Sequence, residues 1–219
     1  MANELAVRYE VDGTEISLNP SIVLNYMVDD QSMQNISRKE MAKVIMTCQA
    51  RHLNPFTGDV VVQPRKNRDG SVACSLVVTK DFFTRQAVKN PRYRGMDAGV
   101  CVLSSDGRPV KRKGCAVYRQ LGEQLIGGWA SVYVDGWQEP SYAEVSLDEY
   151  DQGFALWKTK KATMIRKVAV SQALREAFPL DFGGLYEPEE MGLDPEEVKA
   201  PEQEYEAPEE PMAYAEEGF

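Results

Sequence analysis

The chain has 219 residues, of which 43% are hydrophobic, and this length suits one folded domain with a sizeable core. Its formal net charge of -9 combines two parts of opposite sign: residues 1–186 hold 24 Lys and Arg against 21 Asp and Glu, whereas residues 187–219 hold 1 against 13. No apolar run approaches the ~20 residues of a membrane-spanning helix, and the N-terminus lacks the pattern of a secretory signal peptide. We therefore expect a cytoplasmic protein without membrane contact.

The four cysteines and the single histidine restrict the possible chemistry. The cysteines are far apart and show no C-x-x-C pairing, which predicts reduced, semi-buried thiols rather than disulfides or a zinc site. His52 is the only histidine available to a Ser-His-Asp or Cys-His arrangement, and no G-x-x-x-x-G-K-[ST] phosphate loop is present. We expect no cofactor, no metal and no covalent chemistry.

The N-terminal third predicts an arm followed by two helices. Residues 1–17 alternate loosely between apolar and polar side chains, which is typical of an edge strand or arm. Asn19-Pro20-Ser21 predicts a helix start with proline near the first helical position. Ser37 and Glu40 have the spacing of a capping box, in which the serine accepts from the amide of residue 40 and the glutamate reaches back. The helix that they open is expected to run to about Arg51.

A hairpin and a short helix are predicted next. Leu53-Asn54-Pro55 ends the preceding helix, because the residue before a proline avoids the α region. Residues 59–63 and 73–79 are rich in β-branched side chains and predict two strands, joined by a turn at residues 67–70. Residues 80–89 predict a helix.

Several further strands are predicted in the middle of the chain. Residues 99–104 and 114–118 are expected to be strands joined by a basic loop. Residues 124–134 predict a third strand, and residues 142–145 are expected to pair with it after a turn at Asp135-Gly136. The basic residues of the loop are Arg108, Lys111, Arg112 and Lys113.

Residues 160–178 are the segment that most favours a helix. At about 100° per residue, Lys160, Thr163, Lys167 and Ser171 fall on one face. This face could line a backbone-binding groove with Lys and Ser/Thr donors. The alternative is a core helix whose cations extend to solvent, and spacing alone leaves both open.

These elements predict one α+β domain, a small antiparallel β-sheet with packed helices, over residues 1–188. Residues 189–219 are predicted to form an acidic disordered tail, because their Pro, Glu, Ala and Tyr residues bury too little apolar area to offset the cost of ordering.

Separate basic segments favour binding to a polyanion. Affinity for nucleic acid comes mostly from cations that neutralise phosphates, and single strands add stacking of about 1–3 kcal/mol per base. Motifs of helix-turn-helix, zinc-finger, RRM and KH modules are absent, so binding to the backbone fits better than base readout. The aromatic candidates for stacking, most of them expected in the core, are Phe82, Phe83, Tyr93, Trp129, Trp137 and Tyr186.

Four patches, in order along the chain, resemble the RecT/Redβ family of phage single-strand annealing proteins, and the Redβ (Bet) branch in particular. They are Leu53-Asn54-Pro55-Phe56-Thr57, Gly95-Met96-Asp97, Cys115-x-x-Tyr118-Arg119, and a helix with its following turn, Met164-x-Arg166 to Gln172-x-x-Arg175-x-Ala177-Phe178 and Phe182-x-Gly184-x-Tyr186.

The resemblance implies an ATP-independent activity that anneals single-stranded DNA and holds the annealed duplex intermediate. It also implies a homo-oligomer, as a ring or helical filament, with DNA in a basic groove. A phage 5′-to-3′ exonuclease and a host single-strand-binding protein would be partners. The resemblance and the basic segments together give ten candidate nucleic-acid-binding residues: Arg65, Lys66, Arg85, Lys113, Arg119, Lys160, Lys161, Arg166, Lys167 and Arg175.

We expect cations of three segments, with Lys66, Arg119 and Arg175 as their representatives, to face one trough. The acidic tail stands where Redβ continues into a helical domain. It either competes with DNA, docks a partner or only keeps the protein soluble. The alternatives to an annealing protein are a passive single-stranded DNA-binding protein, a metal-dependent nuclease and a phage scaffold protein.

Overall fold

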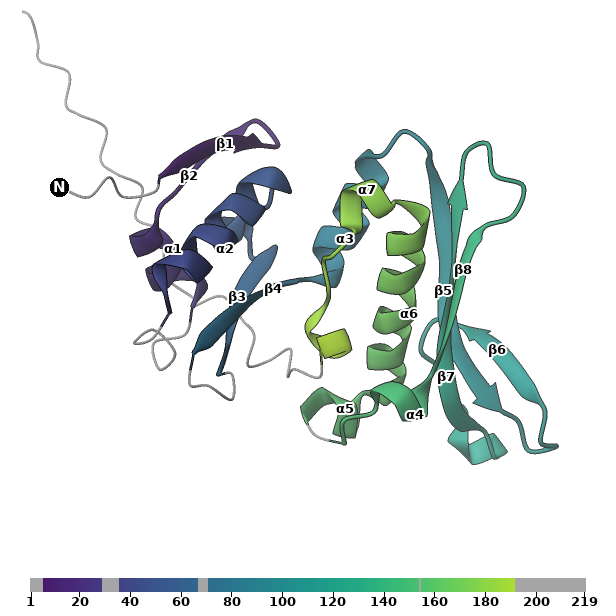
Figure 1. Cartoon of the computed structure of the whole chain (residues 1–219). Coiled ribbons are helices and arrows are strands. Elements are labelled where there is room, and N and C mark those ends of the chain that lie inside the picture. The colour runs from purple at the N-terminus through teal and green to yellow at the C-terminus, as the bar shows by residue number, and fades with distance from the viewer. Residues whose placement is uncertain (1–5, 29–35, 67–70, 154, 192–219) are drawn as a thin grey trace, which may run out of the picture.

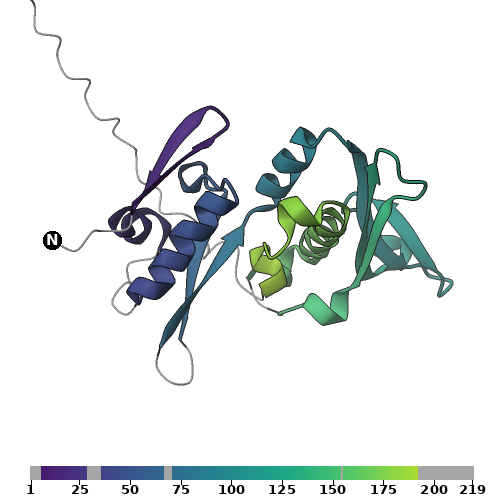
Figure 2. The same ribbon diagram turned by 45° about the horizontal axis from the view of Figure 1, so that its top comes forward.

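The computed structural model describes residues 6–28, 36–66, 71–153 and 155–191, which form two lobes side by side (Figure 1). The N-terminal lobe runs from β1 (Val7–Val11) to β4 (Val72–Val78), and the C-terminal lobe runs from α3 (Lys80–Lys89) onward (Figure 2). One hydrophobic cluster extends through both lobes. The turn predicted at residues 67–70 and the tail beyond residue 191 lie outside the described residues.

The N-terminal lobe begins with an antiparallel hairpin of β1 (Val7–Val11) and β2 (Thr14–Leu18). Asp12 and Gly13 turn it with positive φ angles of 53° and 78°, as a tight two-residue hairpin turn requires. The segment predicted as one edge strand or arm is therefore two paired strands. Two helices follow, α1 (Pro20–Met27) and α2 (Arg38–Ala50).

A second hairpin, of β3 (Val60–Lys66) and β4 (Val72–Val78), packs beside α2. Pro64 lies opposite Cys74. The Cys74 N–H points away from β3 and donates to Glu40 Oε2 at 2.9 Å. This is a pair without cross-strand hydrogen bonds, so the missing N–H of proline leaves no gap in the ladder.

Both predicted helix starts are confirmed. Asn19 Oδ1 accepts from Ile22 N at 2.8 Å, and Ser37 Oγ accepts from Glu40 N at 3.2 Å. The second half of the predicted capping box is wrong, because the Glu40 carboxylate accepts from the Cys74 amide instead. The Glu40 side chain therefore satisfies a backbone amide of β4 instead of capping its own helix.

The C-terminal lobe contains an antiparallel sheet with the strand order β6-β5-β7-β8. Its strands are β5 (Tyr93–Leu103), β6 (Pro109–Lys113), β7 (Gln124–Val134) and β8 (Ser141–Ser146). The helices α3, α6 (Lys161–Ala177) and α7 (Pro179–Phe182) all lie on one side of this sheet (Figure 1). The other helices of this lobe are α4 (Leu147–Tyr150), α5 (Ala155–Thr159) and the 3-10 helices η3 (Arg119–Leu121) and η4 (Pro188–Met191), and the N-terminal lobe also contains the 3-10 helix η2 (Pro55–Thr57).

The sequence-based prediction for residues 108–118 placed the strand and the loop in the wrong order. The basic segment predicted as a loop is the edge strand β6, and residues 114–118, predicted as a strand, are irregular. In β6 the exposed Lys111 and Lys113 alternate with the half-buried Val110 and Arg112. Charged side chains are typical of edge strands because they discourage pairing with other chains.

The α6 helix packs across β5, β7 and β8 and is buried on several sides. Its backbone lies against Gly128 of β7, where an added Cβ would come within 2.5 Å of Ile165 O. Ser171 is fully buried, and its Oγ donates to Lys167 O at 3.0 Å and Val168 O at 3.2 Å. Ser171 therefore does not donate to a ligand. Of the two alternatives for this segment, α6 corresponds largely to the core helix whose cations extend to solvent.

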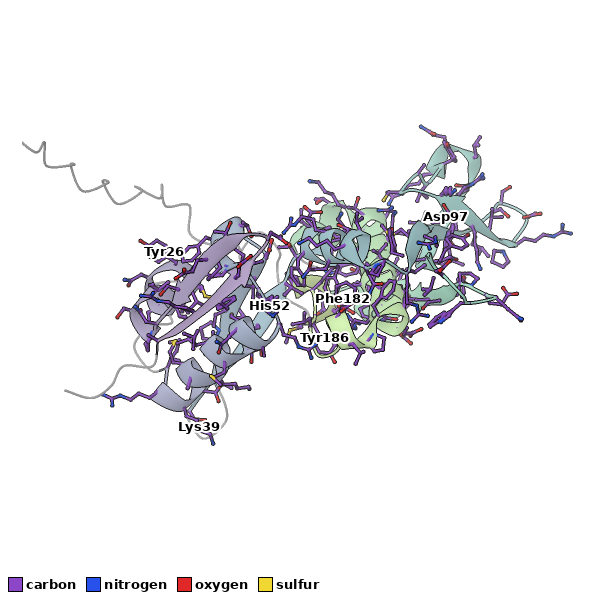
Figure 3. All side chains as sticks on the ribbon, turned by 90° about the horizontal axis from the view of Figure 1, so that it is seen from above. Tyr26, Lys39, His52, Asp97, Phe182 and Tyr186 are labelled. Carbon is purple, nitrogen blue, oxygen red and sulfur yellow. The ribbon has the colours of Figure 1, made fainter. Side chains whose placement is uncertain are left out.

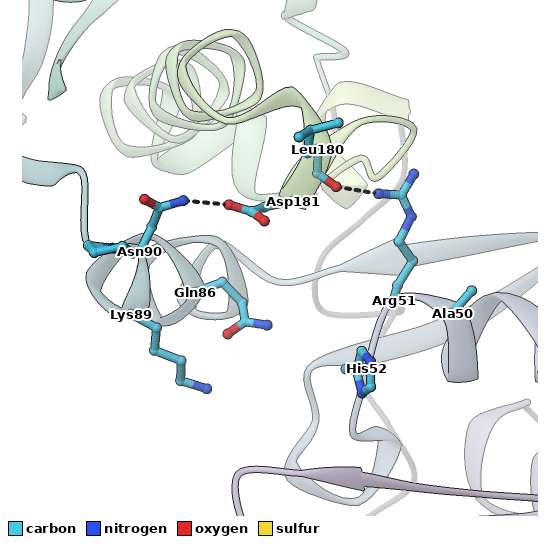
Figure 4. A pocket seen from close by; sticks show the side chains of 9 residues that line it. Ala50, Arg51, His52, Gln86, Lys89, Asn90, Leu180 and Asp181 are labelled. Atoms are coloured by element: carbon cyan, nitrogen blue, oxygen red, sulfur yellow. Dashed lines mark hydrogen bonds between the residues drawn. The ribbon is translucent and has the colours of Figure 1, made fainter. Parts of the chain in front are cut away.

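The two lobes meet at a cleft of about 640 Å³ between the C-terminal end of α2 and the helices α3 and α7 (Figure 4). Arg51 Nη1 donates to Leu180 O at 3.0 Å, and Nη2 donates to Gly183 O at 2.6 Å. Viewed from above, His52 lies on the N-terminal side of this junction, and Phe182 and Tyr186 lie on the C-terminal side (Figure 3). One guanidinium therefore joins the end of α2 to the carbonyls around α7.

Replacing Arg51 with alanine is expected to lower the free energy of unfolding by about 2 kcal/mol, because two charge-assisted hydrogen bonds between the lobes are lost. Urea denaturation measures the change. Arg38→Ala, at an exposed position at the start of α2, is the matched control and should change stability by less than about 0.5 kcal/mol. Equal effects of the two substitutions would show that Arg51 does not join the lobes.

Candidate nucleic-acid interface

Three of the predicted cations gather at the N-terminal end of α6. Lys160 precedes the first turn of α6, Lys161 begins it, and Arg119 belongs to the neighbouring η3. Arg119 and Lys161 line one pocket of about 570 Å³, whose apolar wall includes Leu125 and Leu147. With the exposed Lys158 of α5 they form a surface that we call the α6 N-terminal cluster: Arg119, Lys158, Lys160 and Lys161.

The backbone of α6 adds to this positive charge. Lys160 occupies the N-cap position with φ of -129° and makes no side-chain capping bond, and the first turn contains no acidic residue. The first amides of a helix have no intrahelical acceptor, and the dipole of a 17-residue helix is positive at this end. The helix start therefore favours an anion at the place where the cations gather.

The carboxylates beside the cluster are already neutralised. Glu123 lines the pocket, where it accepts from Tyr118 N at 2.9 Å and from Arg112 Nε at 3.1 Å. The Tyr118 N–H, and then Arg112, hold the pKa of Glu123 below its usual range. Asp151 pairs with Lys161, and although burial raises the pKa of Asp151, this contact and the Gly153 N–H lower it overall.

Three cations of the cluster keep their charge available. Within the part of the chain that the structure describes, Arg119, Lys158 and Lys160 form no ion pair, and all three are exposed. The cluster therefore presents a net positive charge toward solvent.

Arg166 and Lys113, the latter paired with Asp97, continue from this cluster along the sheet edge. Ala98 O accepts from Gly114 N at 3.0 Å and from Arg166 Nε at 3.4 Å, so the Arg166 guanidinium lies beside the residue that follows Lys113. Lys113 Nζ lies 2.6 Å from Asp97 Oδ1, and this contact raises the pKa of Lys113. Residues 114–118 connect Lys113 to Arg119, so five of the ten predicted residues lie around one loop: Lys113, Arg119, Lys160, Lys161 and Arg166.

Arg175 lies apart from the cluster. Its Nη1 donates to Glu190 Oε2 at 2.7 Å, and Nη2 contacts Oε1 of the same carboxylate. Nη1 also donates to Leu185 O at 3.3 Å, and the guanidinium carbon lies 4.9 Å from the centroid of the Tyr186 ring. The side chains of Arg175 and Glu190 are only 16% and 5% exposed. Arg175 thus fastens residues 183–191, which we call the C-terminal strap, onto α6.

The remaining predicted residues are spread over other parts of the fold. Arg85 of α3 pairs with the buried Asp59, and Lys167 is half-buried on α6. Arg65 and Lys66 lie at the end of β3, opposite Ala73 and Val72. Arg175 follows Lys161 by 14 positions in the same helix, so the two residues are about 21 Å apart along α6. The expectation that Lys66, Arg119 and Arg175 face one trough stays a prediction, and Arg175 would join it only after release from Glu190.

Sequence reasoning left two contributors out of the candidate set. Lys158 stands in the same basic run as Lys160, so the basic composition of this segment could have identified it. Arg112 neutralises Glu123, which is 11 positions away in the sequence, and no local pattern reveals such a pair. Among the aromatic candidates, Phe82 and Phe83 are buried, whereas Trp137 and Tyr186 are exposed.

Across residues 6–28, 36–66, 71–153 and 155–191, no group of three or more His, Cys, Asp and Glu side chains is arranged to hold a metal ion. Across the same residues, no helix has the length and apolar character needed to span a bilayer.

Comparison with known proteins gives two matches. The model of the RecT family matches residues 21–207, which is most of the chain. The chain is also 28% identical over 194 residues to the uncharacterized protein UU154 of Ureaplasma parvum serovar 3, an alignment that covers 87% of this chain and 78% of that protein.

Replacing Arg175 with glutamine is expected to lower the free energy of unfolding by about 3 kcal/mol, because the Glu190 carboxylate would stay buried without its cation. Thermal and urea denaturation measure this loss. Arg166→Gln is the matched control on the same helix, since Arg166 makes one weak hydrogen bond to a carbonyl. An Arg175 variant as stable as the Arg166 variant would contradict a structural role for the pair.

The depressed pKa of Glu123 predicts a pH-dependent contribution to stability. A carboxylate whose pKa is lower in the folded than in the unfolded protein stabilises the fold above the ordinary value of 4.5 and loses this effect as the pH falls through the folded value. The difference in unfolding free energy between the wild type and Glu123→Gln should therefore be constant above pH 5 and shrink below about pH 4.5. Denaturation at several pH values tests this, and a difference that does not change with pH would contradict it.

Proposed function

Because the chain belongs to the RecT family, a family of single-strand annealing and recombination proteins, we propose that it anneals complementary DNA strands without ATP. The α6 N-terminal cluster, with Lys113 and Arg166, is proposed to hold the sugar–phosphate chain of the single strand and of the annealed intermediate. The observation that carries this proposal is the set of exposed cations without ion pairs around the positive end of a buried helix.

The proposed mechanism is neutralisation of phosphates rather than bond making or breaking. Each phosphate held by Lys or Arg releases condensed counterions, which gives affinity that falls with salt. Phosphates also accept hydrogen bonds from the first amides of a helix. Contacts limited to the backbone leave the Watson–Crick edges of the bases free, as pairing with a second strand requires. Proteins of the RecT family anneal DNA and do not catalyse covalent chemistry.

Independence from ATP is supported by the missing G-x-x-x-x-G-K-[ST] loop in the sequence. We infer that the protein assembles into a homo-oligomeric ring or filament, because two strands meet faster on a multimer with many backbone sites than on one subunit. A phage 5′-to-3′ exonuclease, a host single-strand-binding protein and a bacterial cytoplasmic location follow from the resemblance to Redβ and are part of the proposal.

The ten candidate residues do not contribute equally in this proposal. Arg119 and Lys160 form the centre with Lys158. Arg166 and the ion-paired Lys161 and Lys113 continue it along the loop of residues 114–122. Arg65 and Lys66 are proposed as outlying contacts at the end of β3. Lys167 on α6 is proposed as a contact of similarly small contribution. Arg85 and Arg175 enter only if DNA displaces Asp59 and Glu190, respectively. The division into a DNA-binding core, residues 1–188, and an acidic tail, residues 189–219, stays part of the proposal.

The double substitution Arg119→Gln/Lys160→Gln is expected to weaken binding to single-stranded oligonucleotides of any sequence. Loss of two phosphate contacts should reduce the slope of log K against log[salt] by about 1.4, since each contact to a single strand contributes about 0.7. Fluorescence anisotropy at several salt concentrations measures both quantities. The control is Lys80→Gln, whose lysine pairs with Asp81 on α3, and it should leave the slope unchanged.

The rate of annealing distinguishes an annealing protein from a passive single-stranded DNA-binding protein. An annealing protein should speed the pairing of complementary oligonucleotides without ATP, and the double variant should lose this effect together with binding. A passive single-stranded DNA-binding protein would slow pairing instead. An unchanged salt slope in the double variant would contradict the assignment of the α6 N-terminal cluster.

A further inference from the structure

A groove of about 330 Å³ lies between α2 and the outer edge of β4, and the C-terminal strap closes one side of it. Its walls combine buried apolar side chains with a polar rim and do not include any of the ten candidate DNA-binding residues. The residues that line it are Lys43, Val44, Thr47, Cys74, Ser75, Leu76, Gly184, Leu185, Tyr186 and Met191.

The edge of β4 has one backbone donor available in this groove. Cys74 N donates to Glu40 Oε2 at 2.9 Å, and Val78 N donates to Tyr186 O at 3.0 Å, so both amides point away from β3. Amides two residues apart on a strand point the same way, so the N–H of Leu76 points into the groove. It forms no hydrogen bond within the described part of the chain. A main-chain carbonyl laid along this edge would satisfy it.

The chain itself leads into the groove. Met191, the last described residue, lines it, and 28 residues follow. The match to the RecT family model continues to residue 207, so the first part of this segment belongs to the pattern that the family shares. The residues that come next are Gly192, Leu193, Asp194, Pro195, Glu196 and Glu197.

The charges at the groove fit this segment. Lys43 at the rim is 65% exposed and lies 4.0 Å from Glu40, whose carboxylate is also occupied by the Cys74 amide. Lys39, one turn earlier and likewise exposed, lies at the outer end of α2 (Figure 3). One apolar residue followed by three carboxylates complements an apolar groove with a basic rim.

We propose that residues 192–197 of the same chain dock in this groove, with Leu193 on its apolar wall, a main-chain carbonyl on the Leu76 N–H and the carboxylates toward Lys43 and Lys39. Leu193 is only two residues from Met191, a reach of about 7 Å in extended chain. The docked segment continues the C-terminal strap onto the N-terminal lobe and adds a second tie between the lobes. The acidic segment is then bound by α2, away from the α6 N-terminal cluster.

Hydrogen exchange of the Leu76 amide in the full-length protein, followed by NMR, tests the proposal. The amide is expected to be protected in the wild type, and Leu193→Asp should reduce its protection at least tenfold. Met212→Asp is the matched control, because it places the same charge in the same acidic segment but away from residues 192–197. The amide of Val100, in the core of the other lobe, should exchange equally in all three proteins and so reports an intact fold.

Two further measurements identify the occupant. Lys43→Glu should also reduce the protection of the Leu76 amide, and adding Glu196→Lys/Glu197→Lys should restore it. Unlabelled wild-type protein mixed with isotope-labelled Leu193→Asp protein should restore nothing, since the segment binds within its own chain. Equal protection in the wild type and Leu193→Asp overturns the proposal, as does restoration by the unlabelled protein, which would place a second copy in the groove.

Discussion

The close approach of α6 to β7 at Gly128 is the contact on which the rest of the C-terminal lobe depends. With no Cβ at this position, the helix backbone reaches the sheet, and strands on both sides of β7 then pack on the same helix. Since α6 is buried on several sides, its direction is set by the core and not by its charges. The positive end of the helix is held where η3 and α5 bring Arg119 and Lys158.

The position of α6 also divides its cations into two groups with different roles. At the N-terminal end Lys160 is exposed beside Arg119 and Lys158, while Lys161 pairs with Asp151 and Arg112 pairs with Glu123. Toward the C-terminal end, Arg175 is covered by the C-terminal strap, and its charge is compensated by Glu190. The start of the acidic segment is therefore packed on the core, while the exposed positive charge is concentrated at the other end of the same helix.

Local patterns predicted the elements whose residues interact with near neighbours in the sequence. The helix starts at Asn19 and Ser37 and the hairpin of β3 and β4 follow from side chains and turns a few residues apart. The prediction failed for β6, because a run of basic residues looks like a loop unless the neighbouring strand is known. It also failed for the Glu40 side chain, whose partner is an amide 34 positions away.

The sequence by itself determined the α+β composition, the family and the set of basic residues from which a phosphate-binding surface can be built. These depend on residue type and local spacing. Tertiary structure alone decided which of those residues stay available, because ion pairs such as Arg175 with Glu190 and Arg112 with Glu123 form between segments that only the fold brings together. A cation in the sequence is a candidate, and its distance to the nearest carboxylate in space decides whether its charge can serve a ligand.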